Sequence, residues 1–519
     1  MGAPGPAAVA VFVLLFGLVT VLGFVAARWR RGNLNELHEW GLGGRRFGSW
    51  VVWFLLGGDL YTAYTFVAVP ALMFGAGAVG FFAVPYATIT YGLLFIAFPR
   101  LWSVSHKHGY VTAADFVRGR FGSGALALAV AVTGIVATMP YIALQLVGME
   151  VVVAGIGISP DVAVPGIGMV HDLPLIVAFV ILALYTYTSG LRAPAMIAVV
   201  KDLLIYATVL AAVIVIPAEL GGYAKIFASV PPAQLILPPA SAANWGAQSA
   251  YATLALGSAL ALFLYPHAVT GVLSSQSAGA IRRNAVALPA YSLALGLLAL
   301  LGYMAIASGV KSDPQFAAGF TRFGNNYAVP ALFLKTLPPW FVGVAFAAIA
   351  IGALVPAAVM SIACANLFTR NIYKEYINPK CSAHGESQMA KIVSLAVKAG
   401  ALFFVIELPN TYAIQLQLLG GIWMIQTLPA VLLGLYTRRL HPMALLLGWA
   451  AGIGTGTWMA AQLDFAKSIY AIHIFGVTIP CYAALSSLVL NLAVSVVLSV
   501  VFNVVTRTPA DATAEADYI

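Results

Sequence analysis

Thirteen apolar stretches of about 20 residues constrain this chain more than any other feature, because each can cross the hydrocarbon core of a bilayer as a helix. Hydrophobic residues make up 61% of the 519 positions and charged residues 8%, whereas a soluble globular protein carries about 25% charged residues. We therefore predict an all-α integral membrane protein. Its spans are expected at roughly 7–27, 49–74, 79–99, 124–157, 174–190, 197–217, 248–275, 285–309, 337–368, 391–408, 411–436, 442–462 and 477–503.

The basic residues predict the orientation of these spans. If the thirteen predicted spans cross the membrane in alternating directions, 21 of the 26 lysines and arginines fall on the same side of the membrane. The other side holds Lys225, Lys311, Arg322, Lys335 and Lys467. The positive-inside rule then puts the N-terminus outside and the C-terminus in the cytoplasm. The net charge of +9 accordingly indicates topology and contact with anionic lipid headgroups, not nucleic-acid binding.

The ends and loops of the chain predict a single membrane domain. Arginines follow the first apolar stretch instead of preceding it, which is the reverse of a cleaved signal peptide, so we expect a retained helix over 7–27. The longest loops have about 30 residues, and the three cysteines show no disulfide or metal spacing. We expect a transmembrane domain over 1–503 and a short cytoplasmic tail over 504–519.

The second span carries an unusual polar segment, GGDLYTAYTF, at residues 57–66. Two glycines precede Asp59, and the hydroxyls of Tyr61, Thr62, Tyr64 and Thr65 follow within two turns. Asp59 could simply bond a neighbouring helix. We favour an unwound helix whose carbonyls and side chains line a solute or ion site, because charges at bilayer depth usually face a cavity or a partner.

The seventh span contains a second interruption, FLYPHAVTG, at residues 263–271. Pro266 removes one backbone hydrogen bond and frees a carbonyl. Tyr265, His267 and Thr270 surround it. His267 is either a proton carrier or a packing residue.

The two interrupted spans lie five spans apart, which is typical of an inverted-repeat transporter with its site near the midplane. The first repeat would cover 49–217 and the second 248–436, followed by two helices over 442–503.

Other polar residues in the spans allow two interpretations each. Tyr141 and Gln145 share one helical face and would line a cavity or join two helices. Asp202, beside Lys201, would form a local ion pair or a gate for ion release. We expect no lysine or arginine in mid-membrane.

Several longer motifs occur in order between residues 7 and 503. They are YVTAADFVRGRFG (110–122), PYIALQLVG (140–148), YTSGLRAPAMIAVVKD (187–202), LYPHAVTGVLSSQSAGAIRRNAVALPAYS (264–292), PAAVMSIACANLFTRNIY (356–373) and IQLQLLGGIWMIQTLPAVLLGLYTRRL (414–440). With these motifs the chain resembles the sodium:solute symporter family, most closely its branch of bacterial lactate, pyruvate and acetate permeases.

The resemblance implies a LeuT-type 5+5 inverted-repeat fold with thirteen helices, N-terminus out and C-terminus in. In sodium-coupled members, Na⁺ is held by backbone oxygens where the first core helix unwinds and by two adjacent hydroxyls on the eighth core helix. The backbone positions correspond to Gly58 and Tyr61, and the positions on the eighth helix to Ala358, Ser361 and Ile362.

Ile362 departs from this pattern, because its side chain offers no oxygen to a cation. Na⁺ is a hard cation that binds oxygen ligands. Either Asp59 or a water supplies a substitute oxygen, or the coupling ion is H⁺. Asp59 and His267 are the candidate proton carriers, with Asp202 as a release relay, and we favour H⁺. No other cofactor or metal is expected.

The resemblance also implies a short monocarboxylate substrate of the lactate, pyruvate, acetate and propionate class, imported across the bacterial cytoplasmic (inner) membrane. Helix N-termini at the two breaks would attract the anion. The expected lining residues are Tyr64, Thr65, Tyr141, Gln145, Tyr265, Thr270 and Trp423.

Two alternatives remain open. The chain could be a Na⁺-coupled carrier of proline, pantothenate or a sugar, or a transporter-like membrane sensor. An enzyme is disfavoured, because the sequence shows no nucleophile–base pair, metal cluster or nucleotide-binding loop.

Overall fold

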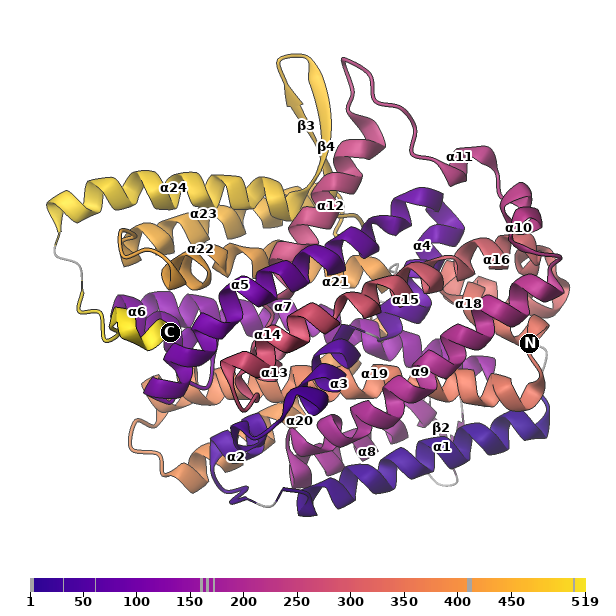
Figure 1. Cartoon of the computed structure of the whole chain (residues 1–519), viewed down its shortest axis with the longest axis horizontal. Coiled ribbons are helices and arrows are strands. Elements are labelled where there is room, and N and C mark those ends of the chain that lie inside the picture. The colour runs from indigo at the N-terminus through magenta and orange to yellow at the C-terminus, as the bar shows by residue number, and fades with distance from the viewer. Residues whose placement is uncertain are drawn as a thin grey trace.

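Long helices run side by side along one axis of the molecule, and the N-terminus and C-terminus lie toward opposite ends of that axis (Figure 1). The computed structural model describes residues 4–30, 32–60, 62–158, 162–164, 168–170, 173–407, 413–506 and 509–519. The first half contains the helices α1 (Pro6–Val25), α2 (Leu37–Leu42), α3 (Ser49–Leu60), α4 (Val69–Ala76), α5 (Ala83–His108), α6 (Ala113–Phe121), α7 (Gly124–Gly155), α8 (Leu173–Ser189), α9 (Arg192–Glu219), α10 (Tyr223–Ser229) and α11 (Pro232–Leu235).

The second half continues with α12 (Gly246–Leu262), α13 (Pro266–Leu273), α14 (Ala278–Ala287), α15 (Pro289–Ala299), α16 (Leu301–Ala307), α17 (Ala317–Phe323), α18 (Ala328–Thr336), α19 (Pro339–Phe368), α20 (Ala383–Glu407), α21 (Ala413–Met424), α22 (Leu428–Val431), α23 (Pro442–Ala461) and α24 (Ala483–Val505). Wide π-type turns form η3 (Tyr64–Ala68) and η8 (Thr369–Ile377). Short 3₁₀ turns join the remaining pieces, among them η9 (Ile425–Thr427), η10 (Leu433–Leu435) and η11 (Glu515–Tyr518).

Each of the thirteen predicted ranges contains helix. In the described part of the chain, nine helices are long and apolar enough to cross a membrane, or ten if the bent pair α12–α13 forms one span. The remaining predicted ranges are occupied by the shorter apolar helices in α3 and α8 and by α20. The total of thirteen crossings stays a prediction.

The last predicted span, 477–503, begins too early. Residues Val477–Tyr482 form strand β4, which pairs antiparallel with β3 (Ile469–Ile474), and α24 begins only at Ala483. Phe475 and Gly476 connect the strands with φ values of 47° and 81°, as a tight hairpin turn of right-handed twist requires. A second short hairpin, β1 (Val162–Val164) and β2 (Gly168–Val170), lies between α7 and α8.

Helix α19 is the centre of the bundle. Its most apolar stretch is almost wholly buried, and it packs against α7, α1, α9 and α20. Alanines line much of its length, and small side chains let neighbouring helices approach closely in a membrane. By contrast, α1 and α24 have mostly exposed surfaces and lie at the outside of the bundle.

Both predicted interruptions are present. Between α3 and α4 the chain leaves the regular helix and re-enters it through η3. Between α12 and α13 the axis bends by 49° just before Pro266. The segments that flank the two interrupted spans are joined by hydrogen bonds. The amide of Phe47, before α3, donates to the carbonyl of Ser274, after α13, at 3.2 Å, and the Gln276 amide donates to the Phe47 carbonyl at 2.9 Å.

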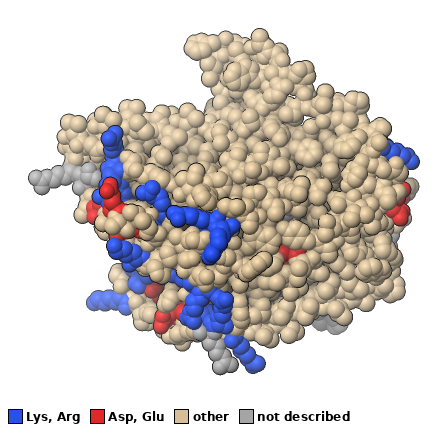
Figure 2. All heavy atoms as spheres, viewed as in Figure 1, with Lys and Arg blue, Asp and Glu red and all other residues tan. Residues whose placement is uncertain are grey.

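Lysines and arginines gather at one end of the molecule, which we call the basic end (Figure 2). The C-terminal segment returns to this end, where Arg120 pairs with Asp511 at 2.7 Å and His108 contacts Asp517 at 2.7 Å. The amide of Ala514, together with Lys107 and His108, holds the pKa of the Asp517 carboxyl well below its usual range. The positive-inside rule predicts that this end faces the cytoplasm, and the orientation stays a prediction.

Cys381 tests this orientation. It is partly exposed between η8 and α20 at the basic end, whereas Cys364 and Cys481 are buried. We expect a membrane-impermeant maleimide to label the protein in inside-out vesicles and not in right-side-out vesicles. The Cys381→Ser variant should remove the label. Labelling of Cys381 in right-side-out vesicles would reverse the proposed topology.

Candidate functional site

Gln145 of α7 caps the broken end of the first interrupted span. Its Oε1 accepts from the Ala63 amide at 3.2 Å. The Tyr64 amide donates to Thr62 Oγ1 at 3.0 Å, and the Thr62 amide donates to Thr65 Oγ1 at 3.3 Å. Side chains thus satisfy backbone groups that the break leaves without helical partners. The structure therefore brings the predicted residues Tyr64, Thr65 and Gln145 together.

A cluster of three rings joins α7 to the second interruption. The ring centroids of Tyr141 and Tyr265 lie 5.3 Å apart, and His267 lies 5.4 Å from Tyr141 and 5.3 Å from Tyr265. All three side chains are buried. The Tyr265 hydroxyl donates to the backbone carbonyl of Gln417 at 3.3 Å, which adds α21 to the cluster. Two predicted substrate residues and one predicted coupling residue therefore meet here.

Several buried polar atoms near these residues have no hydrogen-bond partner in the described part of the chain. They are the Tyr64 hydroxyl, Nε2 of Gln145 and both amide atoms of Gln417. An unsatisfied buried polar group costs about 1–3 kcal/mol. A polar ligand that bonds to these atoms would recover this free energy, so the arrangement is suited to holding one.

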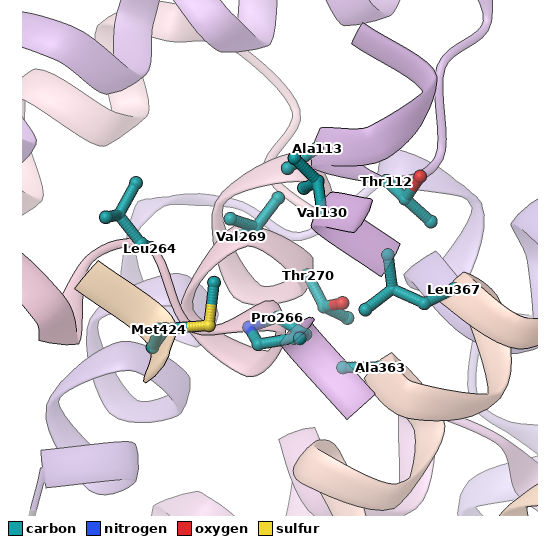
Figure 3. Close-up of a pocket in the computed structure, with 11 residues that line it drawn as sticks. Thr112, Ala113, Val130, Leu264, Pro266, Val269, Thr270, Ala363, Leu367 and Met424 are labelled. Carbon is teal, nitrogen blue, oxygen red and sulfur yellow. The ribbon is translucent and has the colours of Figure 1, made fainter. Parts of the chain in front are cut away.

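Thr270 and Trp423 lie apart from this group. Thr270 is one of the residues that line a small, mostly apolar cavity (Figure 3). The others include Pro266, Val130, Ala363, Leu367 and Met424. The indole nitrogen of Trp423 donates to Thr457 Oγ1 of α23 at 3.0 Å. Trp423 is thus directed toward the C-terminal helices and is not brought together with the three rings.

A lysine occupies the position next to the Gly58 carbonyl. Lys201 Nζ of α9 donates to this carbonyl and lies 3.2 Å from Asp202 Oδ1. The other carboxylate oxygen, Oδ2, accepts from the Tyr291 hydroxyl at 2.7 Å. Both Lys201 and Asp202 have an exposed fraction of 0%. Of the two interpretations of Asp202, the structure shows the ion pair with Lys201, and its role in ion release stays a prediction.

The second half of the predicted cation site lies on α19. Ser361 Oγ donates to the Ala358 carbonyl at 2.8 Å, and Ile362 is fully buried. Ser394 Oγ of α20 donates to Ser361 Oγ at 3.3 Å and accepts from Lys398 Nζ at 2.7 Å. Ser361 is therefore linked through one hydroxyl to a second buried lysine.

The sequence leads us to expect no lysine in mid-membrane, and the structure buries two lysines in the bundle: Lys201 at the Gly58 carbonyl and Lys398 one hydroxyl away from Ser361. Lys398 lies inside the predicted span 391–408, and a lysine within an apolar span is the sequence signal that could have marked it as a candidate site residue. Tyr291, the hydroxyl partner of Asp202, had no signal in the sequence. The side chain of Asp59 and the whole of Tyr61 lie outside the described residues.

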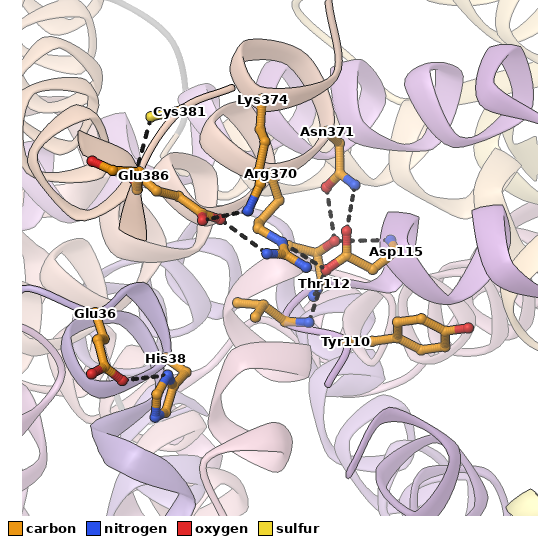
Figure 4. Close-up of polar contacts among 12 residues, drawn as sticks. Glu36, His38, Tyr110, Thr112, Asp115, Arg370, Asn371, Lys374, Cys381 and Glu386 are labelled. Carbon is orange, nitrogen blue, oxygen red and sulfur yellow. Dashed lines mark hydrogen bonds and ion pairs between the residues drawn. The ribbon is translucent and has the colours of Figure 1, made fainter. Parts of the chain in front are cut away.

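A network of charges links helices at the basic end (Figure 4). Asp115 of α6 accepts from Asn371 Nδ2 at 2.7 Å and lies 3.5 Å from Arg370 Nε. Arg370 and Lys374 of η8 both pair with Glu386 of α20, at 3.0 Å and 2.8 Å. The network ties α6, η8 and α20 together, so a motion that moves these three elements apart would have to separate these charges.

Comparisons with known proteins agree with this architecture. A model of the sodium:solute symporter family matches residues 40–452. The "Monocarboxylate transport permease protein" of Rhizobium johnstonii is 53% identical over 494 residues, which cover 95% of this chain and 96% of that protein.

Solved structures show a similar fold at low sequence identity. A Na⁺-coupled sialic acid symporter in a substrate-bound outward-open state matches with a TM-score of 0.73 at 15% identity, covering 96% of this chain and 98% of that one. Mhp1, a nucleobase-cation-symport-1 family transporter in a closed conformation, matches with a TM-score of 0.52 at 12% identity, covering 94% and 100%. The chain thus has the fold of LeuT-type transporters.

Gly57 tests the packing on which the cation position depends. A Cβ atom at Gly57 would lie 2.3 Å from ring carbons of Tyr291, the hydroxyl donor to Asp202. We expect Gly57→Ala to destabilise the protein by about 1–3 kcal/mol through overpacking and to reduce transport. Thermal unfolding of the purified variant and uptake by cells would measure both effects.

Gly92→Ala is the matched control, because a Cβ atom there meets no atom within 4 Å. Equal stability and transport for both variants would show that Gly57 does not pack against Tyr291 as described.

Proposed function

The chain belongs to the sodium:solute symporter family, and from this premise we propose that it imports short monocarboxylates together with protons across the bacterial cytoplasmic membrane. The observation that carries the proposal is the buried ammonium of Lys201 on the Gly58 carbonyl. By the family resemblance, this carbonyl corresponds to the backbone that is expected to bind Na⁺ in sodium-coupled members. The expected substrates are lactate, pyruvate, acetate and propionate.

The contacts of Lys201 support proton coupling over sodium coupling. An ammonium that already donates to the Gly58 carbonyl and pairs with Asp202 fills the space beside this carbonyl and uses its oxygen as an acceptor, so a sodium ion would have to displace it. Sodium would also lose a ligand at Ile362, because a hard cation needs oxygen. The ion pair thus takes the place of a bound Na⁺.

The unpartnered polar atoms support a carboxylate substrate. The Tyr64 hydroxyl and the Nε2 atoms of Gln145 and Gln417 are buried donors without a partner among the described residues, and carboxylate oxygens accept such bonds. The rings of Tyr141 and Tyr265 offer an apolar surface for a short carbon chain. The name of the Rhizobium johnstonii relative points to the same substrate class.

Uptake of radiolabelled lactate, pyruvate, acetate and propionate into proteoliposomes tests the proposal. An inward proton gradient without Na⁺ should drive accumulation, because the fixed ammonium takes the place of the metal ion. A protonophore should abolish accumulation, and replacement of Na⁺ by choline should have no effect. Uptake that choline abolishes and a protonophore does not change would favour the alternative, a sodium-coupled carrier of these acids or of proline, pantothenate or a sugar.

Two substitutions test the role of Lys201 and Ile362 directly. Ile362→Thr alone should gain no Na⁺ dependence, because Lys201 still occupies the Gly58 carbonyl. The double variant Lys201→Thr/Ile362→Thr should gain Na⁺-stimulated uptake, since it removes the competing charge and restores a hydroxyl. The exposed Lys225 provides the control double variant, Lys225→Thr/Ile362→Thr. Sodium dependence of the single variant, or none in the Lys201 double variant, would contradict this account.

A further inference from the structure

Lys398 is buried deep within α20. It lies about 22 Å along the helix from Ala383, at 1.5 Å per residue, and its exposed fraction is 2%. Its Nζ donates to Ser394 Oγ at 2.7 Å, and Ser394 Oγ donates to Ser361 Oγ at 3.3 Å. Ser361 in turn donates to the Ala358 carbonyl at 2.8 Å. A continuous hydroxyl chain therefore connects Lys398 to the predicted cation position on α19.

Lys398 has no carboxylate within ion-pair distance among the described side chains, unlike Lys201. Helices α19, α7, α8, α2 and the turn η8 pack against α20, and α19 and α8 contain no charged residue. On α2, α7, η8 and α20, the acidic groups with described side chains have other partners: Glu39 pairs with Arg192 and Arg46, Glu150 with Arg322, Glu375 with Arg118, and Glu386 with Arg370 and Lys374. His38 contacts Glu36, and Lys391 lies over the ring of Tyr187. The exposed His384 lies at the start of the same helix, about 21 Å from Lys398 along its axis, and the side chain of Glu407 lies outside the described residues. The buried thiol and phenol groups on these helices are Cys364, Tyr141 and Tyr185.

This isolation sets Lys398 apart from Lys201. The Lys201–Asp202 pair is neutral as a whole and bonds to Gly58 and Tyr291, so it can stay charged through the transport cycle. A buried ammonium without a counter-ion costs several kcal/mol. The amine form of Lys398 avoids this cost, and a carboxylate brought close to it would offset the cost of the ammonium form.

We propose that Lys398 is the residue that carries the coupling proton. The proposal rests on the proposed proton-coupled symport. One proton from the outer solution adds to the amine to form the ammonium, and the ammonium later releases this proton to the cytoplasm and regenerates the amine. The protonated form adds one positive charge to the core and thereby favours entry of the anionic substrate. One proton and one monocarboxylate then cross together without net charge.

The test uses the full-length protein in proteoliposomes, with Lys398→Met compared to Lys391→Met on the same helix. Three quantities are measured: lactate accumulation driven by a pH gradient, exchange of labelled for unlabelled lactate at equal pH, and proton entry reported by an internal pH dye. We expect Lys398→Met to lose accumulation and proton entry while it still exchanges lactate, with an exchange rate independent of pH. Lys391→Met should behave as the unmodified protein.

Proton entry coupled to lactate in Lys398→Met would overturn the inference and leave the proposed function intact. A lack of proton entry in the unmodified protein would instead overturn the proposed function. If Lys398→Met shows no exchange, proton-coupled uptake is measured for Lys398→His instead, because histidine keeps a titratable nitrogen that can carry the proton. Proton-coupled uptake by Lys398→His supports the inference, and its absence in a folded, exchanging Lys398→His protein contradicts it.

Discussion

The hydrogen bond between the Lys201 ammonium and the Gly58 carbonyl is the interaction on which the site depends. A helix that breaks inside a bilayer leaves backbone groups that water cannot reach, and these groups need partners from the protein. In this chain the carbonyl side is bonded by Lys201, whereas the amide side is capped by Gln145 and by threonine side chains. The break is therefore held from both sides by α9 and α7.

The same interaction connects the fold to ion coupling. Helix α9 delivers its lysine with an adjacent acid, and Asp202 is fixed in turn by Tyr291 of α15. We propose that this ammonium takes the place of the free cation that the family resemblance implies beside Gly58. On the α19 side, Ile362 is buried and offers no oxygen, and Ser361 is linked through Ser394 to Lys398.

Much of the fold follows from local properties of the sequence. Apolar length predicts where the helices lie, and the glycines before Asp59 and the proline at 266 predict where two of them break. Helical spacing places Tyr141 and Gln145 on one face of α7, and the structure confirms that both reach the broken helices.

The remaining features depend on tertiary packing. Hydropathy assigns lysine to the membrane surface, so the burial of Lys201 and Lys398 appears only when α3, α9, α19 and α20 are packed together. The direction of Trp423 depends on how α21 is rotated about its axis. The sequence of α21 does not predict this rotation, because its apolar residues are spread around the helix instead of forming one face. Strand β4 is short and apolar, and such a run does not distinguish a strand from the start of a helix.

Equilibrium binding of radioactive sodium to the purified protein tests the central claim most directly, because it asks whether the cation position is already filled. The account predicts no saturable Na⁺ binding by the unmodified chain, with or without lactate. Saturable binding of one Na⁺ per chain would contradict it, since Lys201 and a sodium ion cannot both occupy the Gly58 carbonyl.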